Sequence, residues 1–372
     1  MTASSTTGAS VGTPPTTFAP ADALPATRGR SPVPECPSAT ASGVLDRCRA
    51  LVRPALAEAV GRLHPWVGEM AAYSFGWCEV GGAPVATAGG KGLRQALAVL
   101  GAEAAGAPAR AGVAAAVAVE LVHTFSLLHD DIMDGDATRR RRPAVWKAYG
   151  TGPAVLAGDA LFALAVETLA AAPGGAAGVR LLSAALTDLV HGQADDLLFA
   201  ARPWSGPERV APDAYRAMAE GKTGALLGCA ASLGAVLGGA PPATVAALDR
   251  AGRHLGIAFQ VVDDVLGIWG DPAVTGKPVH GDLRERKKTF PVLAALASPG
   301  PAARRLAVLL ESGGDPAETA ALVEEAGGRA SALAEARRQV AAVNAALADV
   351  RLRARAADDL RALLEFLVRR DL

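Results

Sequence analysis

The chain has 372 residues, of which 51% are hydrophobic and only 4% aromatic, and 37 Lys and Arg balance 37 Asp and Glu. A net charge of zero gives no electrostatic reason to expect a nucleic-acid or membrane partner, so any functional charge must be local. The four cysteines include no CxxC pair, which argues against a zinc site or a disulfide framework and predicts a reducing, cytoplasmic location.

The first 40 residues differ from the rest of the chain. They are rich in Ser, Thr, Ala and Pro, and their only acids are Asp22 and Glu35. Such a segment buries little apolar surface, so residues 1–40 are predicted to be a disordered tail. Beyond them helix-forming residues dominate, strand patterns are scarce, and glycines and prolines separate the apolar runs. Residues 41–372 are therefore predicted to form a single all-α domain.

The first chemical signal is the segment GGKGLRQAL, where Lys91 and Arg94 lie three residues apart at the start of a predicted helix. Positive side chains oppose the helix dipole at this end, so a bound anion would stabilise the arrangement.

A buried helix is predicted over 112–134, because its apolar residues cover nearly every face. The helix ends in HDDIMD, where Asp130 and Asp134 are one turn apart and Asp131 lies about 100° away around the axis. Like charges at one-turn spacing repel each other unless a cation lies between them. Hard cations such as Mg²⁺ take oxygen ligands and bridge carboxylates to substrate phosphates.

Four arginines, at 139–142, follow this acidic cluster. Guanidinium groups bind phosphate oxygens in a bidentate fork, so the combination indicates a site for a metal-bound diphosphate. His123 lies two turns before Asp130 on the same face and is predicted to line the site, whereas the role of His129 stays open.

Two more buried helices are predicted over 153–171 and 224–237. The second belongs to a long uncharged stretch, but glycines and prolines after residue 237 interrupt it, so no stable membrane span is expected. Just before it, Lys222 and Thr223 supply a cation and a hydroxyl. Their GKT sequence lacks the first glycine and the strand of a phosphate-binding P-loop.

A second acidic pair, Asp263 and Asp264, lies within an apolar helix predicted over 255–269, and Gln260 shares its face. Two carboxylates in an apolar run are costly to bury without compensation, so a metal ion or a cationic neighbour is predicted. Lys277 and Lys287 follow in the segment GKPVHGDLRERKKT.

These motifs, in their order and spacing, resemble the trans-polyprenyl diphosphate synthase family, of the farnesyl and geranylgeranyl diphosphate synthase type. The resemblance covers most of residues 45–372. It implies the isoprenoid synthase fold, an all-α bundle around a deep central cavity, with the two acidic motifs facing each other across the mouth. It also implies a homodimer and two or three Mg²⁺ ions in each site.

The resemblance also implies roles for individual residues. Mg²⁺ would be held by Asp130, Asp131, Asp134, Asp263 and Asp264. The allylic diphosphate would be held by Arg139, Lys222, Gln260, Lys277 and Lys287, with Thr223 near the path of the cation. Isopentenyl diphosphate would be held by Lys91, Arg94, His123 and Arg140. The ionisation step would depend on Asp130, Asp134, Lys222 and Asp263.

The chain departs from the family pattern at a few positions. Gly267 stands where the second motif commonly ends in Asp, and Gly92 replaces a frequent arginine. Arg141 and the pair His280-Gly281 stand where glycine, and glycine followed by a small residue, are common.

The implied reaction is electrophilic chain extension of an allylic primer, either dimethylallyl, geranyl or farnesyl diphosphate. Cations neutralise the departing diphosphate, and the double bond of isopentenyl diphosphate attacks the carbocation that remains. In the family, bulky residues four or five positions before the first acidic motif close the product tunnel. These positions hold Ser126 and Phe125, so we predict a C20 product, geranylgeranyl diphosphate, with a C15 or a longer product as the alternative.

Other classes remain possible at this point. A terpene cyclase or a head-to-head condensing enzyme shares the fold. The second motif of a cyclase needs an acid with Ser or Thr and Glu downstream, which DDVLGIWGD lacks. An HD-type phosphohydrolase is also helical, and His129-Asp130 resembles its core pair, but it would not need the second acidic pair. A non-catalytic partner subunit would be expected to lose the acidic motifs that this chain keeps.

Overall fold

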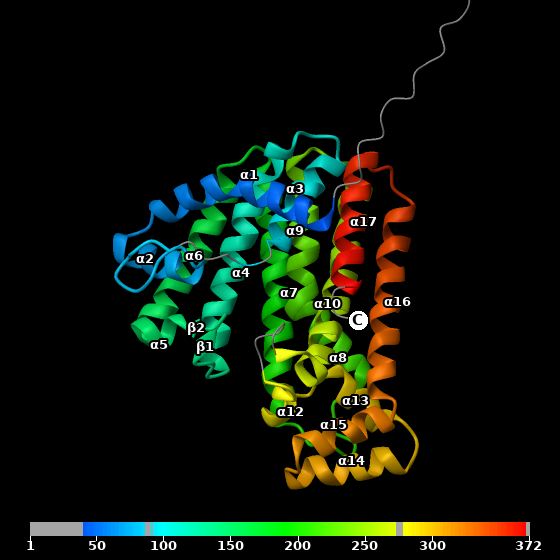
Figure 1. The fold of residues 1–372 in the computed structure, drawn as a ribbon. Coiled ribbons are helices and arrows are strands. Elements are labelled where there is room, and N and C mark those ends of the chain that lie inside the picture. The colour runs from blue at the N-terminus through cyan, green and yellow to red at the C-terminus, as the bar shows by residue number, and fades with distance from the viewer. Residues whose placement is uncertain (1–39, 86–89, 91, 273–277, 370–372) are drawn as a thin grey trace, which may run out of the picture. The chain divides into compact units, whose positions relative to one another are not determined.

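The computed structural model describes residues 40–85, 90, 92–272 and 278–369, and it confirms the all-α prediction (Figure 1). The predicted tail therefore lies outside the described residues, apart from Thr40, whose side-chain oxygen caps the first helix by accepting from the Gly43 N–H.

The described helices and strands fall into two successive groups. The first group is α1 (Ala41–Gly61), α2 (Pro65–Ser74), α3 (Leu93–Ala104), the 3₁₀ turn η1 (Ala109–Gly112), α4 (Val113–Met133), β1 (Thr138–Arg139), β2 (Arg142–Pro143), α5 (Val145–Tyr149), α6 (Thr151–Ala170) and α7 (Gly175–Ala201). The second group is α8 (Pro212–Ala219), the π-helical turn η2 (Glu220–Gly224), α9 (Ala225–Leu237), α10 (Pro242–Trp269), α12 (Gly281–Arg284), α13 (Phe290–Ala297), α14 (Pro301–Ser312), α15 (Pro316–Glu325), α16 (Gly328–Ala348) and α17 (Ala354–Arg369).

The helices predicted from apolar residues are all present, as α4, α6, α9 and the second half of α10. The predicted burial of the helix over 153–171 was wrong, because most residues of α6 lie outside the core. The structure extends α10 back to Pro242, whose missing N–H is tolerated in the first turn of a helix. This first half was not predicted, because its residues are buried on one face only and so lack an all-round apolar pattern.

The centre of the bundle is formed by α9, which packs against α3, α7 and α10. Glycines allow α10 to approach α9 and η2 closely. An ideal Cβ on Gly256 would lie 2.3 Å from Cα of Gly224, and one on Gly252 would lie 2.5 Å from Cα of Gly228. Side chains at these positions would push the helices apart, so the glycines set their spacing.

Two helical segments are long and apolar enough to cross a membrane, η1 with α4 (Ala109–Met133) and α6. The most apolar part of the first segment is 61% buried within the protein, as in a core helix, whereas that of α6 is only 39% buried. The exposed apolar side of α6 therefore needs a separate explanation.

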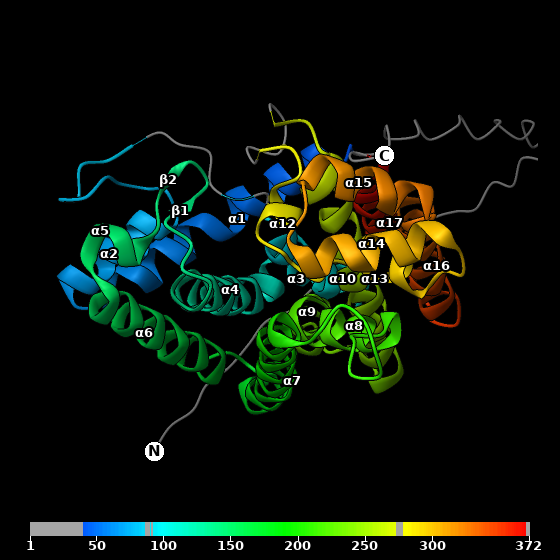
Figure 2. The ribbon, with the colours of Figure 1, turned by 90° about the horizontal axis from the view of Figure 1, so that it is seen from below.

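The acidic motifs lie at the same end of the bundle. Figure 1 shows the β1–β2 hairpin at the lower end of α4 and α12 at the lower end of the α10 side. Seen along this end in Figure 2, α4 lies between α6 and α9, and it contacts both helices.

Candidate active site

The last two turns of α4 carry the first acidic motif. Asp130 is half-buried and Asp134, at the C-cap, is exposed. Loss of hydration raises the pKa of Asp130 to about 6, against the attraction of Lys222, and the neighbouring Asp134 adds to the increase. Loss of hydration likewise raises the pKa of Asp134. The positive charges of Lys222 and Lys287 lower this pKa, and the negative charge of Asp196 raises it further. Charges from three distant segments therefore act on this pair.

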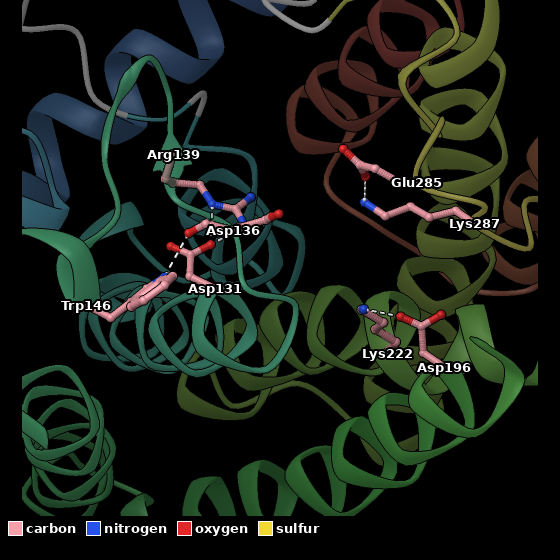
Figure 3. Close-up of polar contacts among 8 residues, drawn as sticks. All are labelled: Asp131, Asp136, Arg139, Trp146, Asp196, Lys222, Glu285 and Lys287. Atoms are coloured by element: carbon pink, nitrogen blue, oxygen red, sulfur yellow. Dashed lines mark hydrogen bonds and ion pairs between the residues drawn. The ribbon is translucent and has the colours of Figure 1, made fainter. Parts of the chain in front are cut away.

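Asp131 faces away from that pair. Its side chain is 4% exposed and accepts hydrogen bonds from Arg139, including one of 2.8 Å from Nε (Figure 3). Arg139 also contacts Asp136 at 3.4 Å, and the Trp146 indole N–H donates to the Asp136 carbonyl at 2.8 Å. Asp131 and Arg139, predicted as a metal ligand and a diphosphate-binding residue, thus bind each other and tie the hairpin to α4.

The four arginines form a two-stranded hairpin that the sequence did not predict. β1 and β2 pair antiparallel, and Arg140 and Arg141 occupy the turn between them with φ of 52° and 62°. This left-handed turn suits the twist of a hairpin but disfavours side chains, so Arg141 stands where glycine would be accommodated more easily. Arg140 extends to Gly90, where an added Cβ would lie 2.7 Å from Nη2, so it reaches the GGKGLR segment.

Arg94 and His123 are brought together between α3 and α4. Arg94 Nη1 lies 3.2 Å from His123 Nε2. Burial, followed by the positive charges of Arg94 and Arg140, holds the pKa of His123 well below its ordinary value, so the ring is neutral. Arg94, His123 and Arg140 therefore share one region, as predicted for a second anion site. The predicted Lys91 lies outside the described residues.

The second acidic motif lies on α10, where Asp263 is exposed and Asp264 is buried. Asp264 accepts hydrogen bonds from the Tyr215 hydroxyl, from the Phe290 N–H at 2.7 Å and from Gln260 Nε2 at 3.3 Å. Burial nevertheless raises its pKa to about 7. The predicted ligand Asp264 thus has its oxygens engaged by the protein, whereas Asp263 makes no such contact among the described residues.

Lys222 and Thr223 lie on the π-helical turn η2. Lys222 forms an ion pair with Asp196 of α7 (Figure 3). The Thr223 hydroxyl donates to Gln260 Oε1 at 3.0 Å. π-Helical turns commonly occur at functional positions, because they project neighbouring side chains in directions that a regular α-helix does not. Asp196 was missed in the sequence. The adjacent acids of GQADDLL, within an otherwise apolar helix, were the available signal.

Lys287, which follows α12, is a third cationic side chain near the acidic motifs, after Arg139 and Lys222. Its Nζ forms an ion pair with Glu285 at 2.7 Å, another residue that the sequence did not single out. In Figure 3 the side chains of Arg139, Lys222 and Lys287 approach a common region from three sides. The predicted Lys277 lies outside the described residues.

Phe125 points toward α6, away from the row of acids. Its ring centroid lies 5.6 Å from that of Phe162 and 4.8 Å from that of His129. Ser126 lies on the acidic face, where its hydroxyl donates to the His123 carbonyl at 3.0 Å. The sequence pointed to Phe125 and Ser126 but missed Phe162, because ring contacts between helices leave no local pattern.

His129 also belongs to the α6 side. Its Nε2 lies 3.3 Å from the Val155 carbonyl, and its ring fills the space that a Cβ on Gly158 would need. His129 and Asp130 therefore diverge, which removes the metal-binding pair that an HD-type phosphohydrolase would require.

A cavity of about 260 Å³ opens beside this site, between α1, α2, α4 and the hairpin. Asp131, Arg139 and Arg140 are part of its wall, together with Tyr73 and Trp77. Among the described residues, no group of three or more His, Cys, Asp or Glu side chains could by itself hold a metal ion. The carboxylates on α4 and α10 therefore do not form a closed set of metal ligands. Mg²⁺ sites commonly have such an open form, because substrate phosphates supply the remaining ligands.

Comparisons with known proteins agree with this geometry. Residues 82–326 match the sequence profile of the family described as polyprenyl synthetase. The chain is 48% identical over 269 residues to a (2E,6E)-farnesyl diphosphate synthase from Mycobacterium bovis, covering 72% of this chain and 74% of the relative. It is 46% identical over 279 residues to a geranylgeranyl diphosphate synthase from Mycobacterium tuberculosis, covering 74% of this chain and 78% of the relative.

Solved structures show the same fold. A polyprenyl synthetase from Streptomyces coelicolor superposes with a TM-score of 0.82 at 47% identity, over 88% of this chain and 99% of that chain. A polyprenyl synthase from Caulobacter crescentus, complexed with calcium and isoprenyl diphosphate, superposes with a TM-score of 0.76 at 27% identity, over 90% and 99% of the two chains.

Proposed function

The chain belongs to the polyprenyl synthetase family and is a prenyltransferase, and we propose that it condenses isopentenyl diphosphate with allylic primers up to geranylgeranyl diphosphate. The observation that carries this proposal is the pair of carboxylates Asp130 and Asp134 on α4. They lie near the cationic side chains of Lys222 and Lys287, which belong to other segments of the chain. Such a site binds a diphosphate through both metal ions and lysines.

Asp130, Asp134 and Asp263 would hold two or three Mg²⁺ ions. Asp134 and Asp130 share a backbone hydrogen bond of 2.8 Å at the end of α4, but the side-chain carboxylates of the three aspartates make no hydrogen bond or ion pair with other described residues, so the carboxylate oxygens are available as ligands. Asp131 and Asp264, by contrast, are engaged by Arg139 and by the Tyr215–Phe290–Gln260 set, and we assign them supporting roles. When bound, Mg²⁺ neutralises the negative charge that develops on the leaving diphosphate.

We assign the cationic side chains of the site to two diphosphate-binding subsites. Lys222 and Lys287, with Lys277, would hold the allylic diphosphate, and Arg139 would border it from the hairpin. Arg94, His123 and Arg140, with Lys91, would hold isopentenyl diphosphate. The short distance of 3.2 Å between Arg94 and the neutral His123 supports this second site, because the ring orients the guanidinium without competing for the anion.

Few residues are needed for the chemistry itself. The C–O bond of the primer breaks, its electron pair leaves with the diphosphate, and the double bond of isopentenyl diphosphate forms the new C–C bond. The proton that is then lost passes to the released diphosphate. Thr223 and Gln260, held together at 3.0 Å, line the region of the carbocation, and the apolar helices exclude water that would quench it.

We propose that Phe125 and Phe162 together close the product tunnel. Bulk from one aromatic ring on α4 and one on α6, beside the small Ser126, supports a C20 product rather than a C15 one. Incubation of the purified protein with Mg²⁺, isopentenyl diphosphate and each primer in turn tests the proposal by chromatography of the dephosphorylated products. Predominant geranylgeraniol is expected. Predominant farnesol contradicts the C20 product, and no condensation with any primer contradicts the function.

The unit of function is proposed to be a cytoplasmic homodimer. Exposed apolar side chains gather on the adjacent helices α6 and α7, including Leu156 (50% exposed) and Leu198 (60% exposed). A second copy of the chain would cover them, as supported by the low burial of α6. Sedimentation of Leu156→Glu and Leu198→Glu should then show monomers, and a parent protein that sediments as a monomer contradicts the dimer.

A further inference from the structure

Arg253 lies on α10, in the region where α7 and α10 both pack against the π-helical turn η2. Its guanidinium binds one acid from each of these three elements. Nη2 lies 2.7 Å from Oδ2 of Asp188 on α7, and Nε lies 2.9 Å from Oδ2 of Asp249 on α10. Nη1 lies 3.7 Å from Oε1 of Glu220 on η2. None of these four side chains has a role in the proposed reaction, so the network needs its own explanation.

The same three elements carry side chains of the allylic diphosphate site. Asp196 of α7 pairs with Lys222 of η2, and Gln260 of α10 accepts a hydrogen bond of 3.0 Å from Thr223 of η2. Arg253 lies seven residues before Gln260, which is about 10 Å along the helix. Since its guanidinium is also turned toward three acids, Arg253 is placed to act on the site through η2 and not on the substrate.

The backbone of η2 is held closely on two sides. An ideal Cβ on Gly221 would lie 2.8 Å from the carbonyl oxygen of Asp188. One on Gly224 would lie 2.7 Å from the carbonyl oxygen of Arg253. The backbones of Asp188 and Arg253 therefore contact the turn directly, one from α7 and the other from α10. Because the side chains of these two residues also bind each other, their ion pair keeps the two helices closed around η2.

The chemistry of the network suits an arginine. Loss of hydration acts to lower the pKa of Arg253, but its hydrogen bonds to Asp188 and Asp249 outweigh this effect and raise the pKa, so the guanidinium stays charged. A planar group with five N–H donors can bind acids in several directions at once. A lysine ammonium is a single point charge and would engage fewer of the three acids.

We propose that Arg253 is a positioning residue, which fixes η2 between α7 and α10 and thereby directs Lys222 toward the allylic diphosphate. This inference rests on the proposed function. The second diphosphate subsite does not depend on this network, because Arg94, His123 and Arg140 belong to α3, α4 and the hairpin. Loss of Arg253 should therefore impair the use of the allylic primer and spare that of isopentenyl diphosphate.

A purely structural role is the competing explanation, since a network of ion pairs between helices also stabilises the fold. Unfolding of part of the protein lowers the apparent kcat but leaves the KM of both substrates unchanged, because the remaining folded molecules are normal. Arg253→Met removes the charge and keeps an apolar stem, whereas Arg253→Lys keeps the charge without the fork. Arg250→Met is the matched control, since Arg250 is exposed on the same helix.

Steady-state kinetics with geranyl diphosphate and isopentenyl diphosphate measure the two KM values separately. Arg253→Met should raise the KM of the primer and lower kcat, each about tenfold, and should leave the KM of isopentenyl diphosphate within about twofold of the parent. Arg253→Lys should show a smaller change in the same direction. Binding of inorganic pyrophosphate in the presence of Mg²⁺, measured by titration calorimetry, should weaken about tenfold in Arg253→Met and remain parental in Arg250→Met.

Asp188→Asn is a milder variant that cuts only the connection to α7, and it decides the matter where Arg253→Met does not fold. It should raise the KM of the primer in the same selective way. The double variant Arg253→Met/Asp188→Asn should be no worse than Arg253→Met alone, because the two changes remove one shared contact.

A parental primer KM in folded Arg253→Met overturns the role of Arg253, and so does an equal increase in the KM of both substrates. A parental primer KM in Asp188→Asn, with Arg253→Met unfolded, overturns it as well. Absence of condensation and of Mg²⁺-dependent pyrophosphate binding in the parent protein overturns the proposed function itself. The parent and the variants therefore distinguish the two failures in one set of measurements.

Discussion

Replacing Gly256 by alanine tests whether the close approach of α10 to η2 determines the position of Lys222. The added Cβ would lie 2.3 Å from Cα and 2.6 Å from N of Gly224. Both neighbours are backbone atoms that cannot rotate away. The two segments must therefore separate by about 1 Å to restore ordinary van der Waals contact.

The expected magnitude follows from two opposing effects. Overpacking costs about 1–3 kcal/mol, whereas alanine gains up to about 1 kcal/mol over glycine in a helix. Gly152 in α6 provides a matched control, because a Cβ there would meet nothing within 4 Å. Gly256→Ala should thus lower the free energy of unfolding by about 1–2 kcal/mol, and Gly152→Ala should raise it by up to about 1 kcal/mol.

Urea unfolding followed by circular dichroism measures both variants. Because η2 carries Lys222, its displacement should also weaken Mg²⁺-dependent pyrophosphate binding about tenfold in Gly256→Ala but not in Gly152→Ala. A Gly256→Ala protein that is as stable as the control and binds pyrophosphate like the parent would refute the argument that these glycines set the site.

Three further outcomes are expected. Phe162→Ala should lengthen the products, because its ring backs the tunnel floor, and an unchanged C20 product by chromatography places the floor elsewhere. Asp131→Asn should lower the free energy of unfolding by about 1–2 kcal/mol, a value reduced for the partial exposure of its arginine partner, but it should keep Mg²⁺-dependent pyrophosphate binding. Asp130→Asn should weaken that binding about tenfold. Equal losses of binding in the two variants would contradict the assignment of Asp130 as a metal ligand and Asp131 as a supporting residue. The half-buried His123 has a pKa lowered by loss of hydration and by nearby arginines, so below about pH 6.5 the unfolded chain takes up a proton that the folded chain does not. Stability should then fall by up to about 1.4 kcal/mol per pH unit, and His123→Gln should remove that part of the slope in urea titrations.

The helices and the acids at their ends were predictable because their signals are local. Apolar residues on nearly every face identified α4 and the second half of α10, and acids within those apolar runs identified Asp130, Asp134 and Asp263. The hairpin of Arg139 to Arg142 was not predictable, since strands of two residues with arginines in the turn carry none of the usual turn residues.

The residues that contact the predicted site residues, such as Asp196 and Phe162, could not be predicted from the sequence for a different reason. Asp196 pairs with Lys222, which is 26 positions away, and Phe162 packs against Phe125 across two helices. Such pairings depend on distances between segments and leave no periodicity in the chain. Adjacent acids at 195–196 were visible, but nothing local distinguished them from a solvated helix face.

The sequence by itself determined that this chain is helical and carries two acidic motifs, because periodicity and motif spacing depend only on neighbours along the chain. The prenyltransferase activity was implied by the resemblance of those motifs to a known family. Only the tertiary structure decided which carboxylates remain available. Asp131 and Asp130 are adjacent in sequence, yet Arg139 engages one and leaves the other. Asp264 is held by Tyr215 and Phe290 from separate helices. A carboxylate is available as a ligand only when no other segment folds onto it, and that is a property of packing.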